Sequence, residues 1–356
     1  MLLLSTSLVG TAGATHVECG DEITQSVTLD SDLGPCPEAG LIVTASGITV
    51  DLNGHRIIGA NDLFADGGID LKNVTGVTVT NGTISNFDAG VVIRRGSRNV
   101  ITNLTIRDNV GNSLRCELGD GIASFNSNDN VIHGNTIELN GPLSGIAIIG
   151  PSTGNRISGN LVRDNHLPAA SPYCGNARQD IGIRLEGPGA IGNKVDANVV
   201  ERNGLAGIAV HSTETQYDQP TNNNNTISDN AVNANGVGGG GSGIIMLPNG
   251  PLGFVARPFA NTVKGNTVRL NATDGIQVGN GSTDNAVVSN QGSGNLRYDA
   301  SDFNLEPPCD NNSWVRNSFL TVNQPCVAGN PKAGPKKQQA DEPLLDIKTR
   351  NLPLGP

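Results

Sequence analysis

One pattern limits what this 356-residue chain can fold into more than any other: asparagines that recur five residues apart. In DNVIHGNTIELN (129–140), Asn130, Asn135 and Asn140 alternate with Ile132 and Ile137. The pattern begins at 98–109 and returns at 154–165, 192–203, 224–235, 260–271 and 284–295. The shortest repeat is about 24 residues long, and the longer ones carry insertions. Repetition at this period predicts a stack of similar structural units.

A second signature, Gly-Ile-x-aliphatic, follows the third asparagine of each group. Examples are GIASF (121–125), GIAII (145–149), GIRLE (182–186), GIAVH (207–211), GIIML (243–247) and GIQVG (275–279). Each repeat therefore holds three short extended segments separated by turns. Within a segment, alternation with a period of two turns one aliphatic side chain inward and the next residue outward. Strands this short bury an inner face only if they coil and stack about 4.8 Å apart, which predicts a β-solenoid.

The asparagines have two expected roles in such a solenoid. They sit at the corners, where asparagine tolerates the left-handed backbone conformation. Equivalent asparagines in successive coils can also hydrogen-bond to one another as a ladder. We therefore expect Asn135, Asn160, Asn198, Asn230 and Asn266 to lie in one line.

This combination of repeats resembles the right-handed parallel β-helix, or pectin-lyase-like, superfamily. The resemblance covers residues 19 to about 326, and residues 19–59 resemble the first coils of secreted bacterial proteins of this type. It implies an all-β, single-stranded right-handed parallel β-helix of about nine to ten coils with capped ends. The expected boundaries are a signal peptide at 1–14, an N-terminal cap at 15–40, the β-helix at 41–326 and a disordered tail at 327–356. The resemblance specifies architecture and leaves activity open, because the superfamily includes lyases, hydrolases, epimerases and adhesins.

Composition agrees with a core of stacked aliphatic layers. Only 36% of the residues are hydrophobic and 3% aromatic, while 47 are glycine. The formal net charge is −10, and no run of Lys and Arg interrupts it. Nucleic-acid binding needs clustered basic residues, so a general nucleic-acid binder is not expected. A polyanionic substrate would be repelled unless a local basic patch or a bound cation intervenes.

The N-terminus and the cysteines indicate a secreted protein. Leu2 to Val9 is apolar and Ala12-Gly13-Ala14 has the form of a signal cleavage site, although the basic segment that normally comes first is missing. We therefore expect the native start to lie upstream of Met1. No later stretch is apolar enough to span a membrane. The six cysteines suit an oxidising compartment, and the pairs we expect are Cys19–Cys36, Cys116–Cys174 and Cys309–Cys326.

Insertions mark the face where function is expected. Those at 110–120, 166–181 and 236–242 precede Gly-Ile strands, whereas those at 212–224 and 248–259 follow them. Together they would wall a groove along the outer face of these strands. Tyr173, Tyr217 and Phe254 lie in the insertions. They are candidate platforms for sugar rings, although they can equally pack their own loops.

Counting two and four residues past each repeat glycine gives the outward positions on these strands. Most are small or apolar, but Arg184, Glu186 and His211 are grouped, with Asp180 just upstream. Glu186 and His211 share register on adjacent coils and should lie about 5 Å apart. They form a candidate acid/base pair, with Arg184 neutralising a uronate. The alternative is a solvated cross-strand charge pair.

Other candidates are weaker. Asp120, Asp180 and Asp274 each precede a Gly-Ile strand, which would suit calcium binding or hydrolytic chemistry, although turn capping explains them equally well. No Cys/His cluster indicates a metal site, and the five scattered histidines offer no copper site. His133 and His166 are isolated and receive no role.

Two function classes stay open. The first is a secreted protein that contacts a polysaccharide or cell-surface glycan in the groove, either as a carbohydrate-active protein, for example a polysaccharide lyase or glycoside hydrolase, or as a carbohydrate-binding protein. The second is a non-catalytic structural or adhesive protein of the cell surface. The catalytic motifs of polygalacturonase-like hydrolases, pectate lyases and alginate epimerases are all missing from the sequence, which favours the second class.

Overall fold

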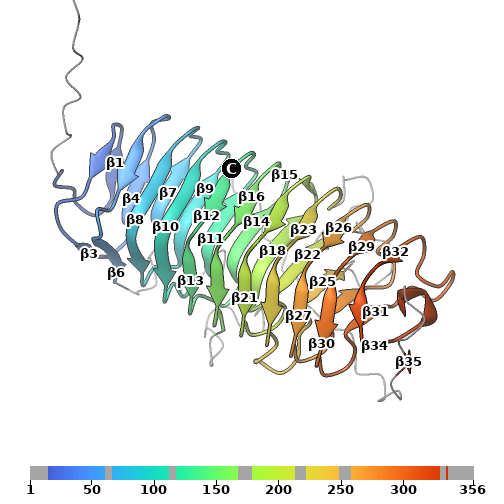
Figure 1. Cartoon of the computed structure of the whole chain (residues 1–356). Coiled ribbons are helices and arrows are strands. Elements are labelled where there is room, and N and C mark those ends of the chain that lie inside the picture. The colour runs from blue at the N-terminus through green and yellow to red at the C-terminus, as the bar shows by residue number, and fades with distance from the viewer. Residues whose placement is uncertain are drawn as a thin grey trace, which may run out of the picture.

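The computed structural model describes residues 15–60, 66–111, 118–166, 179–212, 222–247, 258–328 and 334–335. These residues form one elongated stack of short parallel strands, with the first coils at one end and the last coils at the other (Figure 1). The predicted all-β, parallel β-helix architecture is confirmed. The number of coils and the domain boundaries stay predictions.

One strand of each coil belongs to the first sheet, which contains the Gly-Ile strands. Its order is β1 (Asp21–Ile23), β4 (Leu41–Val43), β7 (Gly67–Lys72), β9 (Ala89–Arg94), β11 (Asp120–Phe125), β14 (Ser144–Ile149), β18 (Ile181–Gly187), β22 (Ile208–Ser212), β25 (Ile244–Leu247), β28 (Ile276–Val278), β31 (Ala300–Asp302), β34 (Thr321–Val322) and β35 (Gly334–Pro335). Every pairing in this sheet is parallel, and successive strands are stacked along the axis of the β-helix.

The second sheet comes next along each coil. It contains β2 (Val27–Thr28), β5 (Thr49–Asp51), the first halves of β8 (Thr78–Ser85) and β10 (Val100–Arg107), β12 (Val131–His133), β16 (Arg156–Ser158), β20 (Lys194–Asp196), β23 (Thr226–Ser228), β26 (Thr262–Lys264), β29 (Ala286–Val288) and β32 (Ser313–Val315).

The third sheet completes the coil. It contains β3 (Leu33–Cys36), β6 (Arg56–Gly59), the second halves of β8 and β10, β13 (Thr136–Glu138), β17 (Leu161–Arg163), β21 (Val199–Glu201), β24 (Ala231–Asn233), β27 (Thr267–Arg269), β30 (Gln291–Ser293) and β33 (Ser318–Phe319). A short pair, β15 (Ser152–Thr153) and β19 (Ala190–Ile191), and the 3-10 turn η1 (Pro325–Ala328) complete the described elements.

The core follows directly from the alternating pattern. In β13, Ile137 is buried between Ile106 and Val162 of the neighbouring coils, while Thr136 and Glu138 point outward. Each aliphatic side chain buried in this way contributes roughly 1.5–3 kcal/mol before conformational entropy is subtracted.

The predicted asparagine line is present. The side-chain amide of Asn135 donates to the Oδ1 atom of Asn160, Asn160 to Asn198, Asn198 to Asn230 and Asn230 to Asn266, each at 2.9–3.0 Å. Two equivalent ladders run beside it, one through Asn130 and Asn155 and one through Asn140 and Asn165. All the ladder side chains are buried. Asparagine is therefore needed here because its amide both donates and accepts along the stack.

The expected backbone role of these asparagines is wrong in detail. The left-handed conformation belongs to the residue before each ladder asparagine: Asp129, Leu139, Asp164 and Ala197 have φ between 53° and 57°. The ladder residues themselves are not among the positive-φ residues. Two neighbouring residues therefore form each corner: the first turns the backbone, and the asparagine that follows points its side chain inward into the ladder.

Two of the three expected disulfides are present. Cys19–Cys36 has a Cα–Cα distance of 5.4 Å and Cys309–Cys326 one of 6.3 Å. Each closes a loop of 17 residues at one end of the stack, which stabilises the fold by about 3 kcal/mol on the chain-entropy account. The expected Cys116–Cys174 pair lies outside the described residues.

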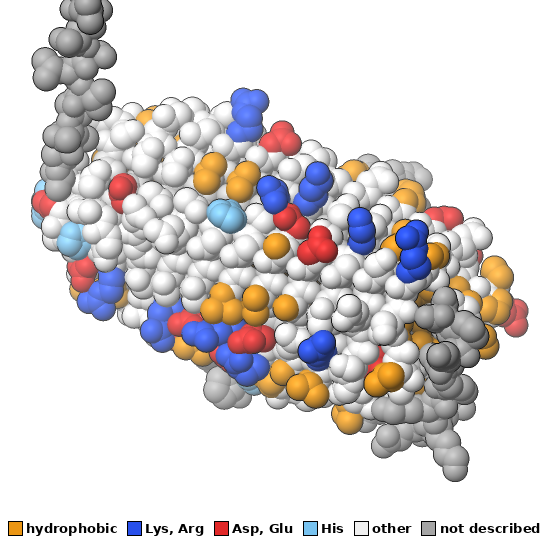
Figure 2. Space-filling view, in the orientation of Figure 1, with side chains coloured by type: hydrophobic (Ala, Val, Ile, Leu, Met, Phe, Trp, Pro, Cys, Tyr) orange, Lys and Arg blue, Asp and Glu red, His pale blue; other side chains and the backbone are white. Residues whose placement is uncertain are grey.

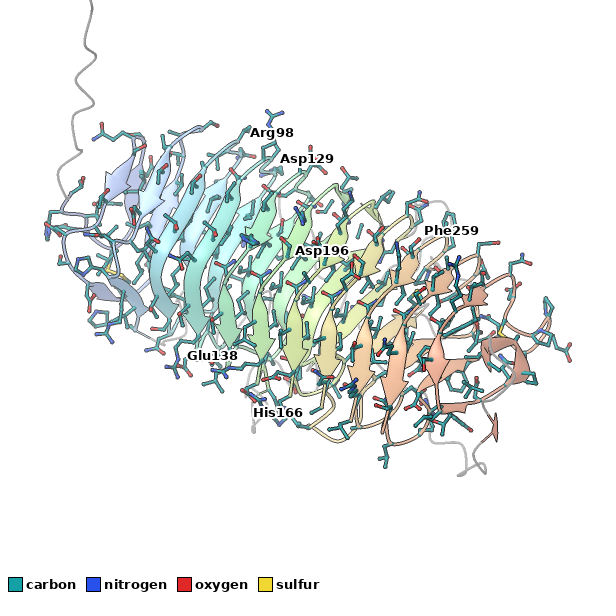
Figure 3. The ribbon with its side chains drawn as sticks, in the orientation of Figure 1. Arg98, Asp129, Glu138, His166, Asp196 and Phe259 are labelled. Carbon is teal, nitrogen blue, oxygen red and sulfur yellow. A yellow bond between two sulfur atoms is a disulfide. The ribbon has the colours of Figure 1, made fainter. Side chains whose placement is uncertain are left out.

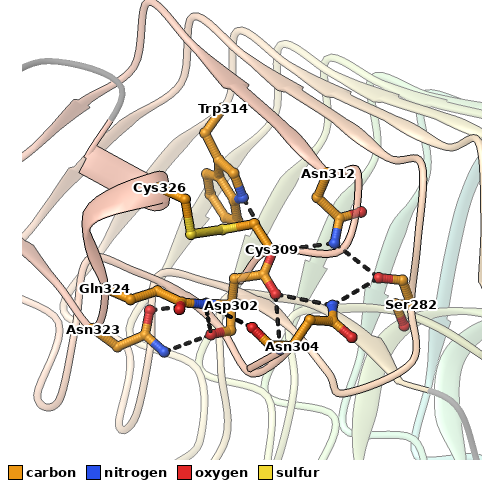
Figure 4. Close-up of a disulfide and its surroundings, with 9 residues drawn as sticks. All are labelled: Ser282, Asp302, Asn304, Cys309, Asn312, Trp314, Asn323, Gln324 and Cys326. Carbon is orange, nitrogen blue, oxygen red and sulfur yellow. Dashed lines mark hydrogen bonds between the residues drawn. A yellow bond between two sulfur atoms is a disulfide. The ribbon is translucent and has the colours of Figure 1, made fainter. Parts of the chain in front are cut away.

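The C-terminal disulfide sits over a buried aspartate (Figure 4). The Asp302 carboxylate accepts hydrogen bonds from Asn304, Asn312 and the indole of Trp314. These hydrogen bonds satisfy the buried carboxylate near the C-terminal end of the stack. Burial nevertheless raises the pKa of Asp302.

The third sheet carries charges on its outer face. Arg107 and Arg163 both contact Glu138, and Arg202 contacts Asp164 and Glu201. Figure 3 shows Glu138 and His166 near one edge of the ribbon, and Figure 2 shows basic and acidic side chains mixed along that edge. Such exposed pairs contribute at most about 1 kcal/mol each. Among the described residues, no helix is long and apolar enough to cross a membrane.

Candidate functional site

The first sheet brings the predicted site residues onto one outer face. Glu186 of β18 is in register with His211 of β22, as the sequence spacing predicts. Arg184 is in register with Ala209 of β22 and Ala147 of β14. The small alanines on either side leave room for the long arginine side chain to lie across the sheet.

Arg184 is the centre of a charged cluster. Its guanidinium forms an ion pair with Glu186, donates to Gln179 Oε1 at 2.6 Å and contacts Asp120 Oδ1 at 3.3 Å. Asp120 lies at the start of β11, two strands away from β18 in the sheet. We name Asp120, Arg184, Glu186 and His211 the sheet cluster.

The sheet cluster is buried. The exposed fraction is 2% for Arg184, 6% for Glu186 and 0% for Asp120 and His211. The alternative of a solvated charge pair is therefore wrong, because water does not reach these groups. A buried ion pair of this kind is costly to assemble and even more costly to break.

Among the described residues, several polar atoms of the sheet cluster have no hydrogen-bond partner. They are Asp120 Oδ2, Arg184 Nε and both ring nitrogens of His211. A buried polar atom without a partner costs about 1–3 kcal/mol, and native proteins contain few of them. Their concentration at one place distinguishes this cluster from the well-satisfied ladders beside it.

Burial also changes the acid–base properties of the cluster. Desolvation raises the pKa of Asp120 to about 6, although the Arg184 charge works in the opposite direction. Desolvation lowers the pKa of His211 to about 4, against the attraction of Glu186. Near neutral pH the imidazole is therefore neutral, whereas Asp120 can still exchange a proton.

Asp180 takes part in a different contact. Its carboxylate lies 3.2 Å from Nδ1 of His166, and both residues belong to the 166–181 insertion. Gly204 allows this approach, since a Cβ atom there would come within 2.6 Å of the imidazole. Sequence reasoning gave His166 no role, because nothing in the sequence reveals that these two residues, 14 positions apart, lie in contact.

Sequence reasoning also missed Gln179 and the contact between Asp120 and Arg184. The sequence alone offers Asp120 as a turn cap, a calcium ligand or a hydrolytic carboxylate. The available signal was its place in front of a Gly-Ile strand, at the outward edge of the sheet that holds Arg184. Two coils separate the residues, so no local spacing connects them.

The three aspartates before Gly-Ile strands do not converge. Asp120 contacts Arg184, Asp180 contacts His166, and Asp274 is held by Arg297 and Ser301. Within the described ranges, no three His, Cys, Asp or Glu side chains gather at a metal-sized site. The candidate sugar platforms Tyr173, Tyr217 and Phe254 lie outside the described residues.

A separate shallow groove of about 490 Å³ lies between the second and third sheets. Asn53, Asn81 and Asn103 line it, together with Thr83 and Thr105. Its amides are connected, as Asn103 donates to Asn81 and Asn81 donates to Asp51. The groove holds no acid–base pair, so it has the chemistry of a contact surface and not of a reactive centre.

Comparisons with known proteins agree with the fold. A family profile described as "Right handed beta helix region" matches residues 40–178. No curated protein sequence matches the chain. A point mutant of the periplasmic alginate epimerase AlgG superposes with a TM-score of 0.54 at 17% identity, covering 82% of this chain and 62% of that one.

Two further solved structures are similar. A point mutant of the tailspike protein of E. coli bacteriophage HK620, in complex with a pentasaccharide, has a TM-score of 0.56 at 14% identity, over 87% of this chain and 58% of the tailspike. The alginate lyase from Paenibacillus sp. has a TM-score of 0.48 at 17% identity, over 84% and 86%. This chain thus spans less than two thirds of the epimerase and the tailspike. At such identities the likeness establishes the fold alone.

Proposed function

We propose that this chain, which has the right-handed parallel β-helix fold, is carbohydrate-active and cleaves a polysaccharide by acid–base chemistry at the sheet cluster. The fold supports this class: one structural neighbour is an alginate epimerase and another holds a pentasaccharide. The two disulfides fit a secreted or periplasmic location.

The single observation that carries the proposal is the set of unpartnered polar atoms in the sheet cluster. A purely structural cluster would be expected to satisfy these atoms, because each unsatisfied one destabilises the fold. Active sites keep such groups available for a substrate, and they also gather side chains whose pKa values are shifted by burial. The sheet cluster has both properties.

The proposed roles follow from the charges. Asp120, with a pKa near 6, is the general acid that protonates the leaving oxygen. Glu186 and neutral His211 lie in register on adjacent strands and supply the base. Arg184 orients Glu186 and stabilises negative charge on the substrate. Asp180 with His166 supports the neighbouring corner as a positioning pair. Tyr173, Tyr217 and Phe254 are proposed as sugar contacts.

Burial favours a second candidate function. His211 is fully buried and Arg184 is nearly so, and a closed cluster suits a non-catalytic structural or adhesive β-helix. In that case the cluster would only fix the register of the strands. The two candidates differ in what a conservative change at Glu186 does.

The discriminating experiment combines a substrate screen with one substitution. The purified protein is incubated with alginate, pectins and glycosaminoglycans, following reducing ends and the absorbance of unsaturated products. Hydrolysis gives only the first signal, whereas elimination gives both. Glu186→Gln removes the carboxylate charge and keeps the shape; because it also breaks the buried pair with Arg184, turnover is compared below the melting temperature of the variant, where it should still be lower by orders of magnitude.

Glu201→Gln is the matched control, because Glu201 pairs with Arg202 on the outer face of another sheet. It should leave turnover unchanged. Full activity in Glu186→Gln would refute the proposed roles. The absence of any product on all substrates, together with unfolding as the chief effect of Glu186→Gln, would support the structural candidate.

A further inference from the structure

One row of side chains extends from the sheet cluster towards the N-terminal end of the same face. It passes from His211 and Glu186 through Ile149 to Phe125, Arg94 and Lys72, all in direct register on successive strands. Strands in a sheet lie about 4.8 Å apart, so Arg94 is roughly 14 Å from Glu186 along the row. A polysaccharide that lies along the helix axis and reaches the sheet cluster would also pass over Arg94.

Arg94 is held in place by an aromatic ring. Its guanidinium carbon lies 5.1 Å from the centre of the Phe125 ring, which is a cation–π contact. Among the described residues no hydrogen bond or ion pair involves this guanidinium, although it attracts the Asp70 carboxylate electrostatically, whereas Arg184 on the same face is paired directly. Its N–H groups are therefore available to a carboxylate or sulfate, which a guanidinium can bind in a bidentate way.

A second observation points to a ligand at the same place. Asp70 of β7 is buried, its Oδ1 atom has no partner and its Oδ2 atom lies 3.6 Å from the Lys72 amine. Gly67 leaves the space for this oxygen, since a Cβ atom there would come within 2.6 Å of it. Asp70 can thus hold Lys72 beside Arg94 and offer one acceptor oxygen to a sugar hydroxyl.

The local charge permits an anion here. Residues 66–98 contain four basic residues (Lys72, Arg94, Arg95 and Arg98) and three acidic ones (Asp66, Asp70 and Asp88), a sum of +1 in a chain whose net charge is −10. A negatively charged glycan is repelled by most of the molecule, so a positive segment at the end of the row selects where it can lie.

We propose that Arg94 and Lys72, with Phe125 and Asp70, form an anchoring subsite for a carboxylate or sulfate group of the glycan, about three strands away from the reactive groups. That the ligand is a glycan rests on the proposed function. The new elements are that this glycan is anionic and that its charge is bound at this subsite.

The test measures binding to the full chain by calorimetry at low and at moderate salt. The probes are alginate as the carboxylated polymer, dextran sulfate as the sulfated polymer and dextran as the neutral one. The wild type should bind one or both anionic polymers and bind dextran far more weakly. Arg94→Met should weaken anionic binding at least about tenfold and flatten its salt dependence, and Arg94→Lys should lie in between.

Arg269→Met is the matched control. It removes the same charge, but Arg269 is an exposed arginine of β27 on another sheet. It should bind like the wild type. Comparing alginate with dextran sulfate decides between a carboxylate and a sulfate ligand. Equal binding of dextran, no binding of either anionic polymer, or full affinity in Arg94→Met would overturn the subsite.

Failure of the proposed function would give a different result. Glu186→Gln should keep Arg94-dependent binding whether or not the wild type has activity. If no glycan is cleaved but anionic binding still needs Arg94, the subsite stands and the catalytic proposal fails. If a substrate is cleaved, Arg94→Met should raise KM and leave kcat nearly unchanged, because Arg94 does not reach the reacting atoms.

Discussion

The hydrogen bonds of the asparagine ladder can be counted, and their number predicts how much the loss of one ladder asparagine lowers the free energy of unfolding. Asn198 lies in the middle of the central ladder and is buried. Its Oδ1 atom accepts two hydrogen bonds at 3.0 Å from Asn160, one from the backbone N–H and one from the side-chain amide. Its own amide donates to Asn230 and to the carbonyl oxygen of Ile157.

Asn198→Ala would remove this acceptor and leave two buried N–H groups of Asn160 without a partner. At about 1–3 kcal/mol for each buried donor, the substitution should destabilise the fold by roughly 2–6 kcal/mol. The backbone adds no penalty of its own, because the left-handed residue at this corner is Ala197 and not Asn198.

The matched control is Asn233→Ala. Asn233 is also an asparagine of the coil stack, but it belongs to no ladder: it is half-buried at the end of β24, and its buried side-chain oxygen has no hydrogen-bond partner among the described residues. The same atoms are deleted without touching the ladder. We expect a change below about 1 kcal/mol for this control.

The assay has to resolve individual coils, because a solenoid can lose structure locally without unfolding as a whole. Hydrogen exchange followed by mass spectrometry, combined with urea unfolding, meets this need. In Asn198→Ala, peptides from β17, β20 and β21 should lose protection while those from the first coils keep it. A destabilisation within about 0.5 kcal/mol of the Asn233→Ala control would refute the view that the ladder stabilises the stack.

Three further predictions test the sheet cluster and the ends of the stack. Because its pKa is lowered, neutral His211 contributes its full share of folding stability above the ordinary pKa of 6.5, and this share is lost as the pH falls towards 4. In Asp120→Asn only the His211 effect remains of the two, so the free energy of unfolding should rise by about 3 kcal/mol between pH 4 and 6.5 in urea titrations. The raised pKa of Asp120 acts in the opposite sense: its contribution to stability is present below the ordinary pKa of 3.8 and is lost as the pH rises through about 6. In His211→Gln the free energy of unfolding should therefore fall by about 3 kcal/mol over that pH range. Parallel pH profiles for the two variants would contradict both assignments. Replacing Cys309 and Cys326 by serine should lower stability by about 3 kcal/mol and lower hydrogen-exchange protection first in β31 and β34, and an effect centred on the first coils would count against local capping.

The architecture was predictable because its determinants are local and repeated. Ile132 and Ile137 alternate with polar residues at a period of two, and the asparagines recur at one interval. Repetition turns a local pattern into a global one, since each coil meets only its neighbours. The conformation of the corners was less predictable, because the left-handed position is often Gly, Asn or Asp, such as Asp129, but is also filled by residues such as Ala197 and Leu139.

The candidate site was only partly predictable. The register of Glu186 with His211 follows from counting residues past each repeat glycine. The partners of Arg184 do not, because Gln179 follows an insertion and Asp120 lies two strands away. A side chain as long as that of arginine crosses several strands, and the sequence does not say in which direction it turns.

The sequence by itself therefore determined the stack, its ladders and the face that carries Arg184, Glu186 and His211, since these depend on spacing within and between similar coils. It also determined the two terminal disulfides, since each joins cysteines that are close in the sequence at one end of the stack. Only the tertiary structure decided that these groups are buried and that Asp120 belongs with them. It also decided that Arg94 lies over Phe125 and forms no direct ion pair with any described residue. The physical reason is that burial and ion pairing depend on what covers a face and on side-chain direction, and a repeat period contains neither.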